Sequence, residues 1–298
     1  MFDWLHLTIP PAPALFAQLL VGLINGAFYA MLSLGLAVIF GLLNIINFTH
    51  GAQYMLGAFC AWFLLNTFGL GYWWALVLAP LIVGVVGIAI ERLFLHHIYR
   101  LDPLYGLLLT FGLALIIEGI FRQQYGSSGQ PYAIPPELRG GRNLGFMFLP
   151  NYRAWVILAS LAVCLATWFT IERTRLGAYL RAATENPILV RAFGINVPRM
   201  ITLTYGAGVA LAALAGVMAA PIYQVSPLMG SNLIIVVFAV VVIGGMGSIL
   251  GAIVSGFTLG LVEGLTKVFY PEASNTVIFV IMALVLLVKP AGFFGQAR

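Results

Sequence analysis

Residues 176–199 read LGAYLRAATENPILVRAFGINVPR and form a polar island between two strongly apolar runs of the chain. Only 8% of the residues in the whole chain are charged, so the number of basic side chains here is unusual. Five arginines lie in the island or directly before it: Arg173, Arg175, Arg181, Arg191 and Arg199. In so apolar a chain, we expect such a segment to lie outside the bilayer, held there by a partner or by lipid.

The composition is that of an integral membrane protein. Hydrophobic residues make up 62% of the 298 positions, and the mean hydropathy is +1.03, whereas soluble domains carry about 25% charged residues. A membrane-spanning helix needs about 20 residues, which leaves room for roughly eight to ten spans and for no separate soluble domain. We therefore expect a single all-α polytopic transmembrane domain over residues 1–298, with eight to nine membrane-embedded helices, some of them short or broken.

Several other classes of function find no support in the residues. The formal net charge of +5 does not indicate nucleic-acid binding, because an excess of basic residues is typical of cytoplasmic loops in multi-pass membrane proteins. Cys60 and Cys164 lie in apolar runs and are expected to be reduced and buried. No cluster of histidines and carboxylates has the spacing of a metal site, and no nucleophile has a suitable base, so no enzyme is predicted.

Nine apolar runs are expected to enter the bilayer as helices. These runs are residues 15–40, 52–66, 72–92, 104–121, 153–171, 200–220, 233–247, 249–266 and 276–289. Residues 122–152 form the longest loop outside the membrane. Its glycines and prolines argue against a long regular element there.

A polar break follows the first run, where residues 41–51 read GLLNIINFTHG. Backbone groups freed at membrane depth must be satisfied by protein or by a water-filled cavity. The break is therefore either an ordinary turn at the interface or a broken helix that lines a transport pathway. The candidate pathway residues in it are Asn44, Asn47, Thr49, His50 and Gly51.

A second break is predicted at residues 244–248, which read GGMGS. The stretch lacks the lysine and hydroxyl residue that end a phosphate-binding loop, so we interpret it as a tight break between two short helices. Gly244 and Gly245 complete the set of candidate pathway residues.

Small residues recur every four positions in several of the apolar runs. Such ladders allow helix backbones to approach closely where lipid offers no hydrophobic drive for association. The ladders comprise Gly22 and Gly26; Gly208, Ala212, Gly216 and Ala220; Gly247, Gly251 and Ser255; and Gly256, Gly260 and Gly264. We expect a tightly packed bundle.

Three glutamates, Glu91, Glu118 and Glu263, lie near the ends of apolar runs. Glu118 precedes Arg122 by four residues and Glu263 precedes Lys267 by four, a spacing that favours an ion pair on a helix. A secondary transporter coupled to an ion gradient is expected to hold acids near mid-membrane. The positions of these glutamates make that class the weaker alternative.

The distribution of basic residues predicts the sidedness of the chain. If residues 91–103 and 172–199 are cytoplasmic, nine Lys and Arg lie on that side and five on the other. Since cytoplasmic loops carry the excess of basic residues, we expect the polar island and the C-terminus to be cytoplasmic and the loop 122–152 to be periplasmic.

The island contains a helix start and a helix stop. Asn186 is a good N-cap, Pro187 is harmless at the first helical position, and Gly194 is a natural C-terminal stop. The predicted helix, residues 187–193, would be about 10 Å long. Its apolar side chains are Ile188, Leu189, Val190 and Phe193, with Arg181, Glu185 and Arg191 around them. This composition suits either a small docking surface or a loop on anionic lipid headgroups.

Residues 180–199, LRAATENPILVRAFGINVPR, resemble the cytoplasmic coupling segment of the branched-chain amino acid class of ABC-transporter permeases, the LivH type. Two further stretches agree at corresponding places, NIINFTHGAQYMLGAF at 44–59 and IGGMGSILGAIVSGFTLGLVEG at 243–264. The resemblance extends over nearly the whole chain and favours docking over lipid binding for the island.

The resemblance implies a transmembrane subunit that passes branched-chain or other hydrophobic amino acids across the bacterial inner membrane by alternating access. The implied partners are a LivM-type sister permease in a heterodimer, two cytoplasmic ATPases that bind Mg-ATP, and a periplasmic binding protein; this chain would hold no cofactor. The implied ATPase-coupling residues are Arg181, Glu185, Asn186, Pro187, Ile188, Leu189, Arg191, Phe193 and Gly194. Urea, short-amide and sugar permeases of the same superfamily are the alternatives.

Overall fold

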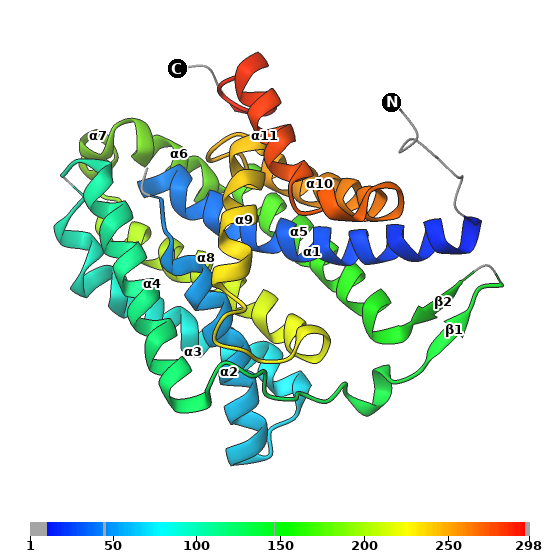
Figure 1. Ribbon diagram of the computed structural model, residues 1–298. Helices are drawn as coiled ribbons and strands as arrows, with labels where there is room; N and C mark the ends of the chain where they lie inside the picture. Colours follow the sequence, from blue (N-terminus) through cyan, green and yellow to red (C-terminus); the bar gives the residue numbers. More distant parts are fainter. Residues whose placement is uncertain (1–10, 44–45, 100, 146, 296–298) are drawn as a thin grey trace.

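The computed structural model describes residues 11–295 except 44–45, 100 and 146. Within these residues, eleven α-helices, three short 3₁₀ helices and one β-hairpin follow one another along the chain (Figure 1). The α-helices are α1 (Ala12–Leu43), α2 (Thr49–Phe68), α3 (Tyr72–Leu93), α4 (Pro103–Tyr125), α5 (Asn151–Arg173), α6 (Arg175–Glu185), α7 (Pro187–Ala192), α8 (Val197–Tyr223), α9 (Ser231–Gly244), α10 (Ile249–Phe269) and α11 (Val277–Val288). The 3₁₀ helices are Leu95–His97, Pro136–Leu138 and Pro271–Ala273, and the strands are β1 (Gly141–Asn143) and β2 (Phe148–Pro150).

The apolar helices correspond to the nine predicted runs, so the chain is an all-α, multi-pass membrane protein. In the described residues, six helices are long and apolar enough to cross a membrane, namely α1, α3, α4, α5, α8 and α10. Helices α9 and α11 are apolar but have only 14 and 12 residues. Helix α2 has 20 residues, and twelve of them are buried inside the molecule. The expectation that some of the apolar helices are short is confirmed for α9 and α11.

Helices α1 and α10 pack with their backbones in contact. A Cβ atom added to Gly260 would lie 2.3 Å from the Cα atom of Gly26, and one added to Gly22 would lie 2.5 Å from the carbonyl oxygen of Gly260. No side chain larger than hydrogen fits at such distances. The predicted role of these glycines in close helix packing is confirmed.

The same kind of contact places α2 against α8 in the centre of the bundle. A Cβ atom on Gly57 would lie 2.2 Å from the carbonyl oxygen of Ala213, and one on Gly216 would lie 2.0 Å from that of Tyr54.

Helices α4 and α5 lie at the outside of the bundle. Only 11% of the most apolar stretch of α4 is buried within the chain, and only 17% of that of α5. Their outer faces are therefore left for lipid or for another subunit.

The segment between α4 and α5 has no long regular element, as predicted, although both helices extend further into it than expected. Strands β1 and β2 pair antiparallel, with Gly141 opposite Pro150. Gln130 and Val225 exchange two backbone hydrogen bonds of 2.7 and 2.9 Å, which tie this segment to the α8–α9 connection. The hairpin and α7 lie at opposite ends of the molecule (Figure 1).

The predicted ion pair between Glu263 and Lys267 is confirmed. Glu263 is buried at the α1–α10 contact, where it also accepts hydrogen bonds from the Tyr29 hydroxyl at 2.7 Å and from Asn25 Nδ2 at 3.1 Å. The carboxylate therefore links α10 to α1 by hydrogen bonds, in addition to forming the ion pair with Lys267 within α10.

The predicted ion pair between Glu118 and Arg122 is wrong. In the described part of the chain, ion pairs join Arg181 to Glu172 and Lys267 to Glu263. Glu118 instead lines a pocket between α4, α2 and α9, while Arg122 is exposed. The packing of α4 against its neighbours, which the four-residue spacing does not reveal, decides where this carboxylate lies.

Gly260→Ala should destabilise the protein, whereas Gly119→Ala should not. The added methyl at position 260 meets the backbone of Gly26 at 2.3 Å, and overpacking of this kind costs about 1–3 kcal/mol. An added Cβ at Gly119 has no heavy atom within 4 Å. Thermal unfolding of both purified variants in detergent measures the difference. Equal unfolding midpoints would contradict the α1–α10 packing.

Candidate functional site

The polar island folds into two helices, of which the sequence predicted only the second. Helix α6, Arg175–Glu185, buries Gly177, Leu180 and Ala183 on one side. Their three-residue spacing is the signal that could have predicted it. A Cβ atom on Gly177 would lie 1.5 Å from the carbonyl oxygen of Ile171, so the turn from α5 into α6 requires glycine at this position.

Helix α7 has the start and stop predicted from the sequence. The Asn186 side chain accepts a hydrogen bond from the Leu189 backbone N–H at 3.0 Å, and Pro187 occupies the first turn. Gly194 has a φ of +82° in open space, the left-handed conformation that ends many helices. The helix ends at Ala192, one residue earlier than predicted.

One side chain anchors α7 and three others remain exposed. Val190 is 6% exposed and packs with Ala183 and Val197. In contrast, Ile188, Phe193 and Leu189 are 80%, 78% and 54% exposed. We call these last three residues the α7 apolar surface. Contiguous exposed apolar patches mark interaction sites, so this surface is a candidate for one.

Of the charged residues in the island, Arg181 stabilises the contact between α6 and α5, whereas Glu185 and Arg191 are exposed to the side of α7. Arg181 donates to the Ile171 carbonyl at 3.1 Å and pairs with Glu172 at 3.4 Å, so it holds α6 against the end of α5. Glu185 and Arg191 are exposed beside the α7 apolar surface. The structure therefore brings eight of the nine predicted coupling residues together around α7, while Arg181 faces α5.

Helix α6 also contacts the end of α1. The Thr184 hydroxyl donates to the Gly41 carbonyl oxygen at 3.2 Å. Gly41 in turn lies against Gly247 in the α9–α10 connection, where an added Cβ would be 3.5 Å from the Gly247 Cα. The polar island, the break after α1 and the break after α9 thus meet at one end of the bundle.

The break after α1 is buried inside the molecule. Asn47, Thr49 and His50 are at most 1% exposed, and the candidate residue Asn44 lies outside the described residues. The Thr49 hydroxyl donates to the Thr110 carbonyl at 3.0 Å, and the Thr110 hydroxyl donates to the Ile46 carbonyl at 3.1 Å. Helix α4 therefore satisfies backbone and side-chain groups that the break leaves free, as buried polar groups require.

Two further polar residues, Gln53 and Tyr205, complete this cluster. Asn47 Nδ2 and Gln53 Nε2 both donate to the Tyr205 hydroxyl oxygen at 3.1 Å. His50 Nε2 lies 3.0 Å from the Leu32 carbonyl oxygen. The cluster ties α2 to α1 and α8. Sequence analysis missed Gln53 and Tyr205, although Gln53 follows His50 by one helical turn.

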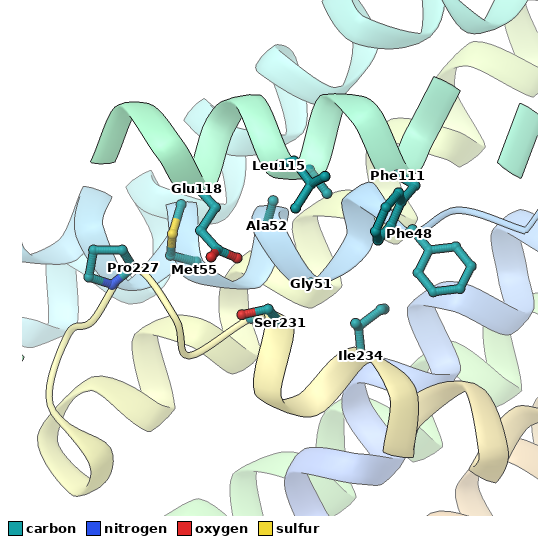
Figure 2. A pocket seen from close by; sticks show the side chains of 12 residues that line it. Phe48, Gly51, Ala52, Met55, Phe111, Leu115, Glu118, Pro227, Ser231 and Ile234 are labelled. Atoms are coloured by element: carbon teal, nitrogen blue, oxygen red, sulfur yellow. The ribbon is translucent and has the colours of Figure 1, made fainter. Parts of the chain in front are cut away.

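Gly51 faces a pocket between α2, α4 and α9 (Figure 2). A Cβ atom on Gly51 would lie 2.7 Å from the Gly230 carbonyl oxygen, so glycine permits α2 to touch the start of α9. Phe48, Phe111 and Leu115 line one part of the pocket, and Glu118 extends into it from α4, with Ser231 on the opposite side.

Gly244 and Gly245 lie apart from the His50 cluster. The Gly244 carbonyl accepts from the Phe294 N–H at 3.0 Å, and a Cβ atom on Gly245 would lie 2.4 Å from the Gly295 nitrogen. Residues 244–248 form a tight break, as predicted, with Gly245 and Gly247 at φ values of 101° and 84°. Of the two helices that it joins, only α9 is short.

Comparison with known proteins finds one matching family and several similar relatives. Residues 18–287 match the family described as branched-chain amino acid transport system / permease component. The chain is 30% identical over 294 residues to the high-affinity branched-chain amino acid transport system permease protein LivH of Escherichia coli (strain K12), covering 94% of this chain and 95% of LivH.

Two further relatives match over most of this chain. BraD of Pseudomonas aeruginosa, named a permease of the same kind of system, has the same identity and coverage. LivM of Escherichia coli (strain K12) is 28% identical over 298 residues, covering 91% of this chain and 68% of LivM. No solved structure matches the chain significantly. With a family match over residues 18–287, this chain belongs to the permease components of branched-chain amino acid transport systems.

Proposed function

We propose that this chain is a permease subunit of an ATP-driven importer that passes branched-chain or other hydrophobic amino acids across the bacterial inner membrane by alternating access. It pairs with a LivM-type sister permease, and the pair binds two cytoplasmic ATPases and a periplasmic binding protein. ATP and Mg²⁺ are bound by the ATPases. The names of the relatives support the substrate class, and the similarity of this chain to LivM supports pairing between two related permeases.

The observation that carries this proposal is the α7 apolar surface. Its three side chains are 54–80% exposed, yet the helix beneath them is capped at both ends and anchored by Val190. A rigid apolar patch with charges at its rim has the composition of a protein-binding site. On the side of the chain that carries the excess of basic residues, such a site suits a cytoplasmic ATPase.

A continuous series of contacts leads from this surface into the membrane helices. Val190 packs on Ala183 of α6, Thr184 of α6 binds the Gly41 carbonyl, and α1 then ends at the break before α2. Because capped helices and packed interfaces move as units, an ATPase that shifts α7 would shift the end of α1 as well. This is the mechanical link that alternating access requires.

Uptake by the assembled transporter tests the proposal. Proteoliposomes that contain this chain, the sister permease and the ATPases should accumulate leucine when the binding protein and ATP are present. Proteoliposomes with this chain alone and a proton or sodium gradient should not. Accumulation by the chain alone without ATPase would overturn the proposal in favour of a secondary transporter.

Ile188→Asp and Phe193→Asp should each weaken the binding of the ATPase. A carboxylate on the α7 apolar surface would be buried without a partner, and losing an apolar anchor costs about 2 kcal/mol or more of binding energy. Phe148→Asp is the matched control, because Phe148 is 61% exposed on the hairpin at the other end of the molecule. Co-purification of the ATPase with the permease measures the effect, and equal recovery in all three variants would argue against this surface.

Gly194→Pro and Glu185→Arg should abolish ATP-dependent uptake without changing the affinity of the binding protein for free substrate. Proline fixes φ near −65°, whereas Gly194 has a φ of +82° and donates its N–H to Arg191 at 2.9 Å. Glu185→Arg reverses a charge beside the α7 apolar surface. Normal uptake in both variants would remove the coupling role.

His50→Ala and Asn47→Ala should alter the kinetics of uptake while leaving membrane insertion intact. His50 links α2 to the Leu32 carbonyl, so its removal loosens the junction that follows the break. His96→Ala is the matched control, because His96 is an exposed residue of the 3₁₀ helix Leu95–His97. Uptake kinetics that are identical in the three variants would contradict a role for the break in transport.

A further inference from the structure

A second and larger hollow opens between α1, α2 and the α8–α9 connection. It is a half-open cleft of about 400 Å³, which lies within the range of about 300–1,000 Å³ that small-molecule sites occupy. It shares no residue with the His50 cluster, with Gly244 or with Gly245. None of the residues predicted for the pathway from the sequence contributes to it.

The lining of the cleft combines neutral polar groups with an apolar wall. The polar groups are the side chains of Asn25, Tyr29, Tyr54, Tyr223, Ser226 and Asn232. Phe28, Met229 and Leu233 supply the apolar wall. Among the described residues, none with an ionised side chain lines the cleft. Hydroxyl and amide groups can both donate and accept hydrogen bonds. They therefore suit a zwitterion, which carries one positive and one negative group and no net charge.

A hydrogen-bond network behind the cleft fixes three of these polar groups. Asn25 donates to Glu263 at 3.1 Å and accepts from the Tyr223 hydroxyl at 2.6 Å, and Tyr29 donates to Glu263 at 2.7 Å. Lys267 pairs with the same carboxylate. Second-layer partners of this kind hold the groups of a binding site in one orientation before a ligand arrives.

Tyr54 has no such partner. Its side chain lines the cleft and is 0% exposed, and its hydroxyl has no hydrogen-bond partner among the described residues. Buried polar groups are nearly always hydrogen-bonded. A polar atom of a molecule bound in the cleft would satisfy this hydroxyl.

The cleft is far from the α7 apolar surface. Helix α8 begins beside α7, where Val197 packs on Val190, and its 27 residues carry the chain about 40 Å away. The cleft lies at the far end of α8, where Gln130 pairs with Val225. In the proposed importer, this is the end at which a periplasmic binding protein delivers substrate.

We propose that this cleft receives the transported amino acid. The apolar wall takes an aliphatic side chain, and the hydroxyl and amide groups take the ammonium and carboxylate groups. Tyr54 supplies one hydrogen bond, and Glu263 acts only by positioning Asn25 and Tyr29. The identity of the ligand rests on the proposed function, whereas the position of the cleft does not.

Tyr54→Phe and Tyr132→Phe form a matched pair for a test in the complete transporter. Both hydroxyls are buried without a hydrogen-bond partner in the described residues, but Tyr132 does not line the cleft. Tyr54→Phe should lower ATP-driven leucine uptake about fivefold, the equivalent of one hydrogen bond. Tyr132→Phe should match the unmodified complex. Equal uptake in both variants would contradict the role of Tyr54.

Chemical labelling of the same complex tests the cleft without transport. Ser226→Cys, with Cys60 and Cys164 replaced by alanine, places a thiol in the lining, and Asn143→Cys on β1 places an exposed control thiol far from it. Leucine should slow maleimide labelling at position 226 several-fold and leave position 143 unaffected. Protection by glucose or urea in place of leucine would overturn the ligand class.

The two proposals fail differently. If the unmodified complex shows no ATP-driven uptake of any amino acid, the proposed function is wrong. If it takes up leucine, but leucine protects neither thiol and Tyr54→Phe behaves like Tyr132→Phe, the cleft is not the receiving site and the proposed function stands.

Discussion

The close backbone contact between α1 and α10 is the constraint on which the other features depend. Lipid does not drive apolar helices together, so they associate through van der Waals contact and buried hydrogen bonds. Gly22, Gly26 and Gly260 allow that contact at distances where no larger residue fits. Helix α1, held in this way, presents Gly41 to the polar island at one end and Asn25 to the cleft further along.

Buried polar groups add orientation to this packing. Glu91 accepts from Thr202 of α8 at 2.9 Å and from Tyr99 at 2.6 Å. Burial and the neighbouring Glu91 raise the pKa of Tyr99 well above its ordinary value, so its hydroxyl stays protonated and donates. Glu263 plays the same part between α10 and α1. Since a buried polar group that loses its hydrogen-bond partner is destabilising, both carboxylates fix how neighbouring helices face one another.

The two ends of the molecule are consequently different in kind. At one end, α6 and α7 present a rigid apolar surface supported by Val190 and by the Thr184 bond to α1. At the other, the cleft is lined by groups that Glu263 holds in place. Helices α1 and α8 run between the two ends, and both are tightly packed against their neighbours.

The sequence by itself determined the membrane class, the nine apolar helices, the cap at Asn186 and the stop at Gly194, because hydropathy and capping are properties of neighbouring residues. Only the tertiary structure decided that His50 is buried beneath α1, that Glu118 lines a pocket and that Asn25 meets Glu263. The last two are separated by 238 positions. Such contacts depend on how the helices pack, which apolar periodicity does not specify when a helix is apolar on every side.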